Sequence, residues 1–382
     1  MALEKSLTLT DLVFFGIASI IGSGGFNLIG EAVMKGGNWW PAALAISSAV
    51  LMGAARTYEE AWEAFKTNTA ESDFVKKIFG DRVSDATAVA VLLWNILSIG
   101  TILVICAHML FPEGTWFGQI TFALTLLGGM GFLSLKGIDV DKEVINFFTA
   151  GLILILTAAS VLGLGGLASK GLPSVPTAPD QSFVTSLLYF FFILAGFDAL
   201  IKFTEEAKDP KDIPRSFYIS NLLSIALVLG LCIAFVTSVD MRKLRTFDNG
   251  IGEIFHTYLG GNTKTAVIYF SVLYMIITTF VAFLATTRYM YGLGDVYKGL
   301  AFMKTVNEAK APTAAIFSTL ATSAATILVN HTEWLVRAAD FSLASLLLIV
   351  ASAAAAQKGG FPLVEGGTAA SMAGLMALSF LK

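Results

Sequence analysis

Long apolar runs separated by short polar stretches fill this chain. A membrane-spanning helix needs about 20 mostly apolar residues. Runs of about that length or longer occupy residues 9–34, 40–64, 83–111, 117–135, 144–168, 183–206, 214–238, 264–292, 312–330, 334–356 and 362–381. The pattern therefore predicts an all-α, polytopic membrane protein with about eleven transmembrane helices and little chain left for a soluble domain.

The composition agrees with a lipid environment. Of the 382 residues, 55% are hydrophobic and only 14% are charged. Soluble proteins carry about 25% charged residues, so the composition excludes a cytosolic enzyme and a disordered protein. A net charge of −3 gives no indication of nucleic-acid binding. The two cysteines, Cys106 and Cys232, provide neither a disulfide scaffold nor a zinc site.

The distribution of Lys and Arg predicts the orientation. With a cytoplasmic N-terminus, fifteen of the 25 basic residues fall on inside segments and eight on outside segments, while Lys202 and Arg288 lie within helices. Cytoplasmic segments carry the excess of basic residues, so we expect the N-terminus inside and the last of eleven spans ending outside. The first apolar run is too long for a cleavable signal peptide. We expect an integral protein of the plasma membrane.

Two helices contain unusual small residues in their apolar interiors. The first run contains Gly22-Ser23-Gly24-Gly25, and three glycines in four residues favour an unwound backbone. A close-packing patch of small residues is the alternative. In the sixth run, Ala195-Gly196 precedes Asp198, and a carboxylate inside a membrane indicates function by default. Lys202 follows four residues later, so the two side chains share a helical face and can pair, for function or for structure alone.

These two segments hold corresponding positions, each in the first helix of a five-helix set. The sets span residues 1–168 and 183–356, with an additional C-terminal helix at 362–382. Interrupted helices at matching places in two halves indicate the midplane site of a transporter. Free N–H groups at a half-helix bind an anion and free carbonyls accept from a cation, so a zwitterion satisfies both.

Several motifs resemble those of the amino acid–polyamine–organocation (APC) superfamily of permeases, which have the LeuT fold. Residues 20–26, Ile-Ile-Gly-Ser-Gly-Gly-Phe, resemble the pattern I-I-G-[ST]-G-I-F, with Gly25 where Ile is usual. Residues 192–198 resemble F-x-x-x-G-[FW]-[DE]. Residues 204–215 are similar to E-E-x-K-N-P-x-x-x-I-P-R, which is the most specific match.

Weaker matches extend this resemblance over residues 7 to 356. Residues 65–80 follow F-P-K-A-G-G-x-Y-x-Y-x-K-x-x-F-G, with Lys66 where Pro is usual and Thr69-Ala70 where Gly-Gly is usual. Residues 288–292 resemble S-R-x-x-Y-A at the end of helix 8. One further span follows where the family normally has two, so a twelfth helix is not expected.

The resemblance implies a LeuT-like 5+5 inverted repeat with broken helices 1 and 6, and it assigns roles to particular residues. The N–H groups of Ser23, Gly24 and Gly25 hold the substrate carboxylate, and the carbonyls of Ile20, Phe192, Ile193 and Ala195 accept from its ammonium. Phe197 forms an aromatic gate, Asp198 biases the site towards cations or stabilises the break, and Trp94 lines the pocket or faces lipid or core.

The coupling ion is left open between sodium, a proton and ion-independent exchange, and no other cofactor is expected. Leu152 stands where some family members carry a proton-coupling lysine. Thr278 and Thr279 are candidate sodium ligands, with helix packing as the alternative, and Lys202 is a candidate for neutralising a site. Residues 111–116 contain no cysteine, so we expect no disulfide-linked partner subunit.

The sequence therefore predicts a secondary transporter that moves an amino acid by alternating access, and not an enzyme. A polyamine or organic-cation carrier is the alternative that Asp198 and Glu205-Glu206 favour. A transport-inactive sensor or accessory relative is a third, motivated by Lys66 and by the number of spans.

Overall fold

We describe the fold from a computed structural model, which places residues 3–22, 28–170, 181–238, 250–329, 331–358 and 367–369. These residues form helices joined by turns, with two isolated bridges (Leu7 to Ala207 and Val306 to Pro312) and no strand. The elements are α1 (Leu9–Ile20), α3 (Ile29–Gly36), η1 (Gly37–Trp39), α4 (Trp40–Phe65), α5 (Ala70–Phe79), α6 (Asp81–Leu110), α7 (Trp116–Ser134), α8 (Ile138–Lys170), α9 (Gln181–Leu194), η2 (Phe197–Glu206), α10 (Asp212–Ser238), α11 (Gly250–Leu259), α12 (Thr263–Val296), η3 (Lys298–Lys304), α13 (Thr313–Val329) and α14 (Thr332–Gln357).

Seven segments among the described residues are long and apolar enough to cross a membrane. They are Asp81–Leu110, Trp116–Ser134, Ile138–Gly165, Ser182–Glu206, Asp212–Ser238, Thr265–Val296 and Trp334–Gln357. An integral membrane protein is thereby confirmed, with fewer clear spans than the predicted eleven.

The other predicted spans differ for identifiable reasons. The first stops early because α1 ends at Ile20, and α13 has only 17 residues. Trp, Pro, Ser and charged side chains dilute the apolar content of α4. The run 362–381 lies outside the described residues, except for 367–369.

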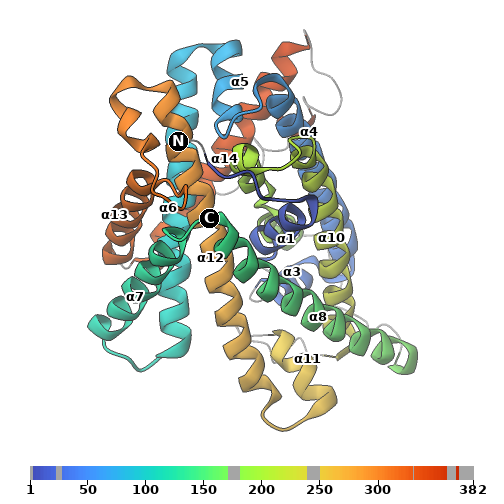
Figure 1. The fold of residues 1–382 in the computed structure, drawn as a ribbon. Helices are drawn as coiled ribbons and strands as arrows, with labels where there is room; N and C mark the ends of the chain where they lie inside the picture. Colours follow the sequence, from blue (N-terminus) through green and yellow to red (C-terminus); the bar gives the residue numbers. More distant parts are fainter. Residues whose placement is uncertain are drawn as a thin grey trace.

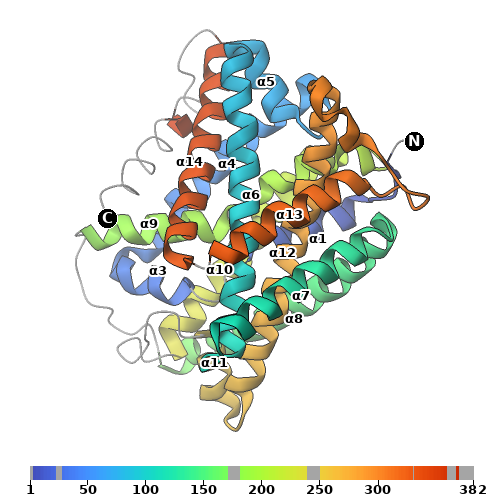
Figure 2. The same cartoon turned by 90° about the vertical axis from the view of Figure 1, so that its left-hand side faces the viewer.

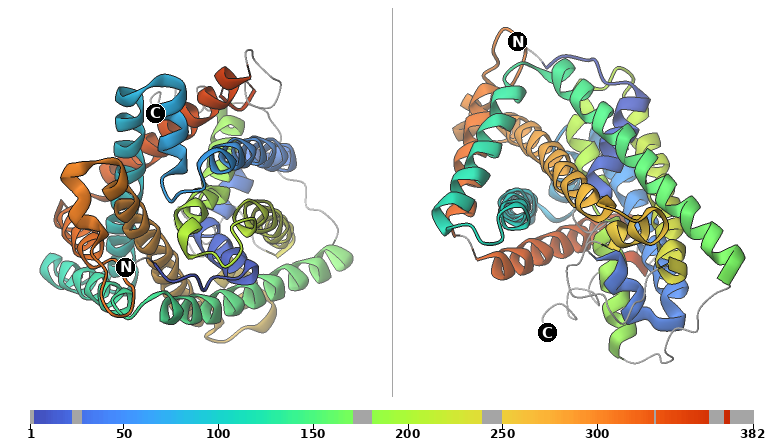
Figure 3. Two further views of the ribbon diagram at one scale, coloured as in Figure 1. Left: turned by 45° about the horizontal axis from the view of Figure 1, so that its top comes forward. Right: turned by 90° about the horizontal axis from the view of Figure 1, so that it is seen from below.

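The long helices form one bundle around the short helix α1. Figure 1 shows α6, α10 and α12 running through the height of the molecule, with α8 crossing one side at a slant. In Figure 2, α14 runs beside α6. Seen along the height of the molecule in Figure 3, α1 lies inside the bundle, where it contacts α8, α10, α12 and η2. Four neighbouring elements therefore hold α1 in place.

Direct contacts gather several connecting segments at one face. The N-terminal segment before α1 bridges to the segment after η2, because Lys208 N donates to Leu7 O at 2.8 Å. Glu205 N donates to Asn68 Oδ1 at 3.0 Å, joining η2 to the α4–α5 loop. Asn307 Nδ2 donates to Leu135 O at 2.7 Å, joining the η3–α13 and α7–α8 connections. We call this side of the molecule the loop face.

The local sequence explains how α1 starts and how α4 stops. Thr8 and Asp11 form a reciprocal capping box at the first turn of α1, which satisfies otherwise unpaired N–H groups. Lys66 closes α4 in a left-handed conformation, with φ 53° and ψ 42°. Proline, whose φ is fixed near −65°, cannot adopt this conformation, so the loop path here depends on the Lys66 that replaces the family's usual residue.

Candidate functional site at two helix interruptions

The winding of the first helix ends in the middle of its apolar run. α1 stops at Ile20, Ile21 has the non-helical angles φ −82° and ψ 54°, and the next helix among the described residues is α3, which begins at Ile29. The predicted carboxylate-binding residues Ser23, Gly24 and Gly25 lie outside the described residues. Helix ends leave backbone groups without intrahelical partners, so α1 ends where a ligand can use its last carbonyls.

The sixth predicted span is interrupted at the predicted small pair. α9 ends at Leu194, Ala195 and Gly196 are not helical, and the chain continues as the 3₁₀ helix η2 from Phe197. Gly196 has φ 127° and ψ −8°, a backbone conformation that side chains disfavour. Both predicted interruptions therefore begin where expected: the first where α1 ends, and the second where α9 ends.

The two interruptions touch each other. A Cβ on Gly196 would lie 2.6 Å from the carbonyl oxygen of Ser19, in the last turn of α1. Helix α12 closes the other side of that turn, because Thr278 Oγ1 donates to Ala18 O at 2.8 Å. A Cβ on Gly22 would approach Thr278 Cγ2 at 2.8 Å. Main chain from α1, main chain from the α9–η2 break and a hydroxyl from α12 therefore meet at one place.

The structure places the other predicted site residues unevenly around this point. Ile20, Ile193 and Ala195 are buried next to the interruptions, while Phe192 is half-buried and packs edge-on against Phe191. Trp94 is half-buried on α6 and packs against the main core.

Two further candidates have partners of their own. Phe197, predicted as a gate, is buried between Tyr58 (ring centroids 5.4 Å apart) and Phe217 (6.1 Å apart). Thr279 donates to Met275 O within its own helix, so Thr278 is the threonine of the pair that reaches α1.

Asp198 and Lys202 form the pair that their spacing predicts, together with a third residue that the sequence did not indicate. Lys202 Nζ lies 3.0 Å from Asp198 Oδ2 and 2.9 Å from Glu71 Oε1 of α5, and it also donates to Asp198 O at 2.8 Å. All three side chains are buried. We call Glu71, Asp198 and Lys202 the Lys202 cluster.

A second buried cluster lies one turn further along η2. Arg288 of α12 donates to both carboxylate oxygens of Glu206, at 2.9 and 3.0 Å, a bidentate geometry that makes strong pairs. Asp141 of α8 approaches the same guanidinium at 3.8 Å. We call Asp141, Glu206 and Arg288 the Arg288 cluster. Together the two clusters tie η2 to α5, α12 and α8.

Comparison with known proteins identifies the type of protein. A family described as amino acid permease matches residues 7–362. The chain belongs to the amino acid permease family. It is thereby placed in the APC superfamily that the motifs predicted, and the family points to a membrane transporter rather than an enzyme.

Two relatives of this permease have curated descriptions. It is 24% identical over 272 residues to the inner membrane transport protein YbaT of Escherichia coli, covering 67% of the chain and 62% of the relative. It is 21% identical over 315 residues to the branched-chain amino acid permease BcaP of Bacillus subtilis, covering 76% of the chain and 67% of the relative. The matched part of the permease thus spans about two thirds of each relative's length.

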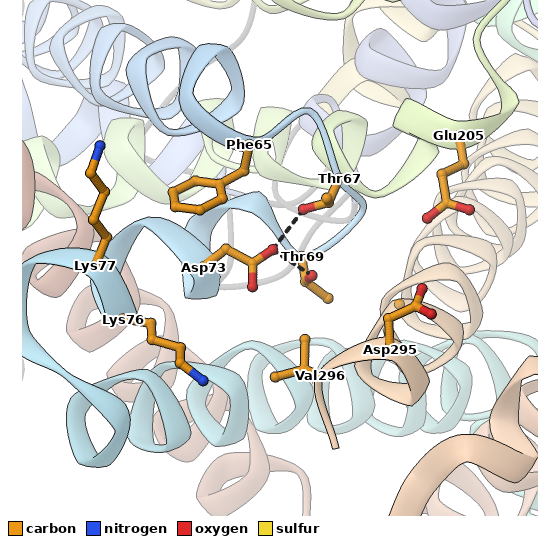
Figure 4. A pocket seen from close by; sticks show the side chains of 10 residues that line it. Phe65, Thr67, Thr69, Asp73, Lys76, Lys77, Glu205, Asp295 and Val296 are labelled. Atoms are coloured by element: carbon orange, nitrogen blue, oxygen red, sulfur yellow. Dashed lines mark hydrogen bonds between the residues drawn. The ribbon is translucent and has the colours of Figure 1, made fainter. Parts of the chain in front are cut away.

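A cavity of about 500 Å³ opens at the loop face of this permease. Figure 4 shows Asp73 of α5 in it, accepting from Thr67 and Thr69, with Glu205 and Asp295 across from it and Lys76 and Lys77 to one side. The cavity therefore reaches the first turn of α5 and the end of η2, the same two elements that the Lys202 cluster joins. We call it the vestibule.

Sequence reasoning predicted the Asp198–Lys202 pair but missed Glu71 and the whole Arg288 cluster. Arg288 and Glu206 are charged residues at or inside apolar runs, which indicates that each needs a partner, but a single sequence does not identify it. Nothing in the sequence marks Glu71 as a buried acid, because it lies in the polar segment Ala70-Glu71-Ser72-Asp73. Its neighbour Asp73 has the same charge but faces the vestibule.

Proposed function

We propose that this permease is a secondary transporter that carries an amino acid across the membrane by alternating access. The observation that carries the proposal is the contact between Gly196 and Ser19, which brings two helix interruptions from distant parts of the chain together. The proposal includes a LeuT-like 5+5 repeat with about eleven spans. Counted in the order of the predicted spans, and not by the α labels, spans 1, 2, 6 and 7 rock against spans 3, 4, 8 and 9.

The proposed substrate is a zwitterion without a cationic side chain. Its carboxylate binds the N–H groups of Ser23, Gly24 and Gly25, and its ammonium binds the carbonyls of Ile20, Phe192, Ile193 and Ala195. Of the three acids that favoured a polyamine, Asp198 is paired with Lys202 and Glu206 with Arg288, while Glu205 lines the vestibule. Because Asp198 and Glu206 each have a cationic partner already, a zwitterion is favoured over a polyamine. The name of the branched-chain permease BcaP makes leucine, isoleucine and valine the first candidates.

Orientation and coupling complete the proposal. The loop face collects segments assigned to the inside by their Lys and Arg content, which supports a cytoplasmic N-terminus. If sodium is the coupling ion, Thr278 is better placed than Thr279, since its hydroxyl already reaches the end of α1.

A thermal-shift screen of the purified protein against amino acids and polyamines, with and without sodium, tests the proposal. A ligand at 100 times its dissociation constant stabilises the folded state by about 2.7 kcal/mol. We expect a branched-chain amino acid to raise the melting temperature and putrescine to leave it unchanged. Stabilisation by putrescine alone would favour the polyamine alternative.

Uptake into proteoliposomes then tests the site. We expect labelled leucine to accumulate and unlabelled lysine to compete poorly. Gly24→Leu is expected to abolish uptake, because a side chain fills the space for the carboxylate, while expression stays near normal. Undiminished uptake by this variant contradicts the site assignment.

A further inference from the structure

The Lys202 cluster has more negative than positive charge. Lys202 supplies one positive charge, and the carboxylates of Glu71 and Asp198 supply two negative charges. Lys202 and Glu71 are fully buried and Asp198 is 2% exposed. Burying an uncompensated charge is costly, and such sites bind or lose a proton instead.

The surroundings do not compensate this excess. From α4, Tyr58 faces the cluster, with Lys202 Nζ 5.9 Å from its ring centroid, and from α12 Tyr289 does the same at 6.0 Å. Both phenols are neutral near pH 7. The neighbouring Arg288 cluster also contains one cation and two carboxylates. Among the described residues, no cation other than Lys202 lies within ion-pair distance of the Glu71 or Asp198 carboxylates.

Glu71 lies as close to the Lys202 ammonium as Asp198 does, but it has the poorer hydrogen-bond geometry. Asp198 accepts a hydrogen bond from Lys202 on its side chain and another on its main chain. Neither oxygen of Glu71 has an aligned hydrogen-bond donor among the described residues, although Oε1 lies 2.9 Å from Lys202 Nζ. Glu71 also belongs to the same turn of α5 as Thr69 and Asp73, which line the vestibule. Glu71 itself is fully buried and does not line the vestibule, so water from the loop face reaches it only when this turn moves.

We propose that Glu71 is a proton-binding site that controls the cytoplasmic gate: closure of α5 against η2 binds a proton at the Lys202 cluster, and opening releases that proton through the vestibule. A proton on Glu71 leaves Lys202 and Asp198 as a neutral pair, which is the arrangement that tolerates burial. This inference rests on the proposed function, because it names the ion whose binding controls the gate of that transporter.

The direction of the pH effect follows from linkage. Burial raises the pKa of Glu71 in the closed structure, outweighing the attraction of Lys202. Once α5 moves away from η2, Glu71 meets water and returns towards its ordinary pKa of about 4.3. The closed state therefore binds more protons than the open state. Acid stabilises the closed gate, and that stabilisation is lost as pH rises through the closed-state pKa.

Neither charged partner belongs to the motifs that carry the family resemblance. Glu71 occupies a variable position of the pattern over residues 65–80, and Lys202 falls between the motifs at 192–198 and 204–215. The pair thus lies outside the motifs on which the family resemblance rests.

Thiol labelling of a residue behind the gate tests the proposal. Ala195→Cys places a thiol at the α9–η2 break, and the native Cys106 and Cys232 are buried and give little background. A membrane-impermeant maleimide is applied from the loop face of reconstituted, substrate-free protein at a series of pH values. We expect the labelling rate to rise with pH, by at most about tenfold per pH unit, the limit for one released proton.

Three variants in that background decide the assignment. Glu71→Gln keeps the cluster neutral, so labelling should stay low and should no longer depend on pH. Lys202→Met leaves two buried carboxylates, so labelling at pH 7 should rise more than about tenfold. The control is Glu60→Gln, which removes the acid of ion pairs with the exposed Lys358 and Arg56 and should label like the parent.

Each result bears on the proposal. A parent rate that is flat or rises in acid overturns it, as does an unchanged pH response in Glu71→Gln. If Lys202→Met does not fold, as judged by size-exclusion chromatography, the parent and Glu71→Gln still decide. Labelling needs no substrate, so a failed ligand screen combined with the expected labelling rejects the proposed substrate and keeps the proton-binding gate.

Discussion

The α9–η2 interruption and the two ion clusters on η2 are only a few residues apart, yet they are built from different chemistry. At the interruption the partners are main-chain atoms and small residues, with Gly196 against the carbonyl of Ser19. In the clusters the partners are long charged side chains from α5, α8 and α12.

This difference indicates that the interruption binds the ligand and that the ion clusters control the gate. Backbone groups at a helix end are fixed in place and recognise the carboxylate and ammonium common to all amino acids. Buried ion pairs contribute little net stability, but they are strongly disfavoured once one partner is removed. They therefore suit a contact that must be either fully made or fully broken. Variants in the two regions should accordingly fail in different ways.

The largest effect is expected for Arg288→Met. The substitution leaves Glu206 and Asp141 buried without a cation, which costs about 3–5 kcal/mol. We expect a large drop in melting temperature and in the yield of folded protein. The double variant Arg288→Met with Glu206→Gln removes one stranded charge and should recover part of the loss. A single variant as stable as the parent would show that the Arg288 cluster does not hold η2.

The apolar pattern predicted most of the fold because bilayer thickness imposes a length on each span. Seven runs reappear as long apolar segments, one of them interrupted at Ala195-Gly196, and their ends fall close to the predicted ones. The first run was predicted as a single segment to residue 34, whereas α1 ends at Ile20. Hydropathy does not register a break in winding, since Gly and Ile are both apolar. Only the glycine cluster indicated it.

The site was predictable where backbone shape depends on residue type, and not where it depends on pairing. Ala195-Gly196 marked the second interruption because few residues other than glycine adopt φ 127°. Asp198 and Lys202 were predictable as a pair because a fixed spacing on one helix joins them. Glu71 comes from a different element more than a hundred residues away, and only the ion pair that links α5 to η2 in the folded chain selects it over Asp73.

A smaller effect on stability, but a clear one on binding, is expected for Gly196→Ala. The φ of 127° costs a side chain about 1–3 kcal/mol, and the new methyl group also presses on the Ser19 carbonyl. We expect weaker amino-acid binding in the thermal-shift assay, because α1 must move. Gly260→Ala is the matched control, with φ 64° and nothing within 4 Å of its Cβ. Equal effects of the two substitutions on binding would mean that the contact between the interruptions is unimportant.

The smallest effect is expected for Lys358→Ala, which tests whether burial rather than charge pairing makes the η2 clusters sensitive. Lys358 pairs with Glu60 at 2.6 Å, a shorter separation than any in the Lys202 cluster, but its side chain is 39% exposed. Water screens such a pair, so its loss should cost no more than about 1 kcal/mol, with unchanged labelling at Ala195→Cys. A loss as large as that of Arg288→Met would show that separation, not desolvation, sets the strength of these pairs. The proton-binding gate would then lose its physical basis, because Glu71 differs from Glu60 chiefly in being buried.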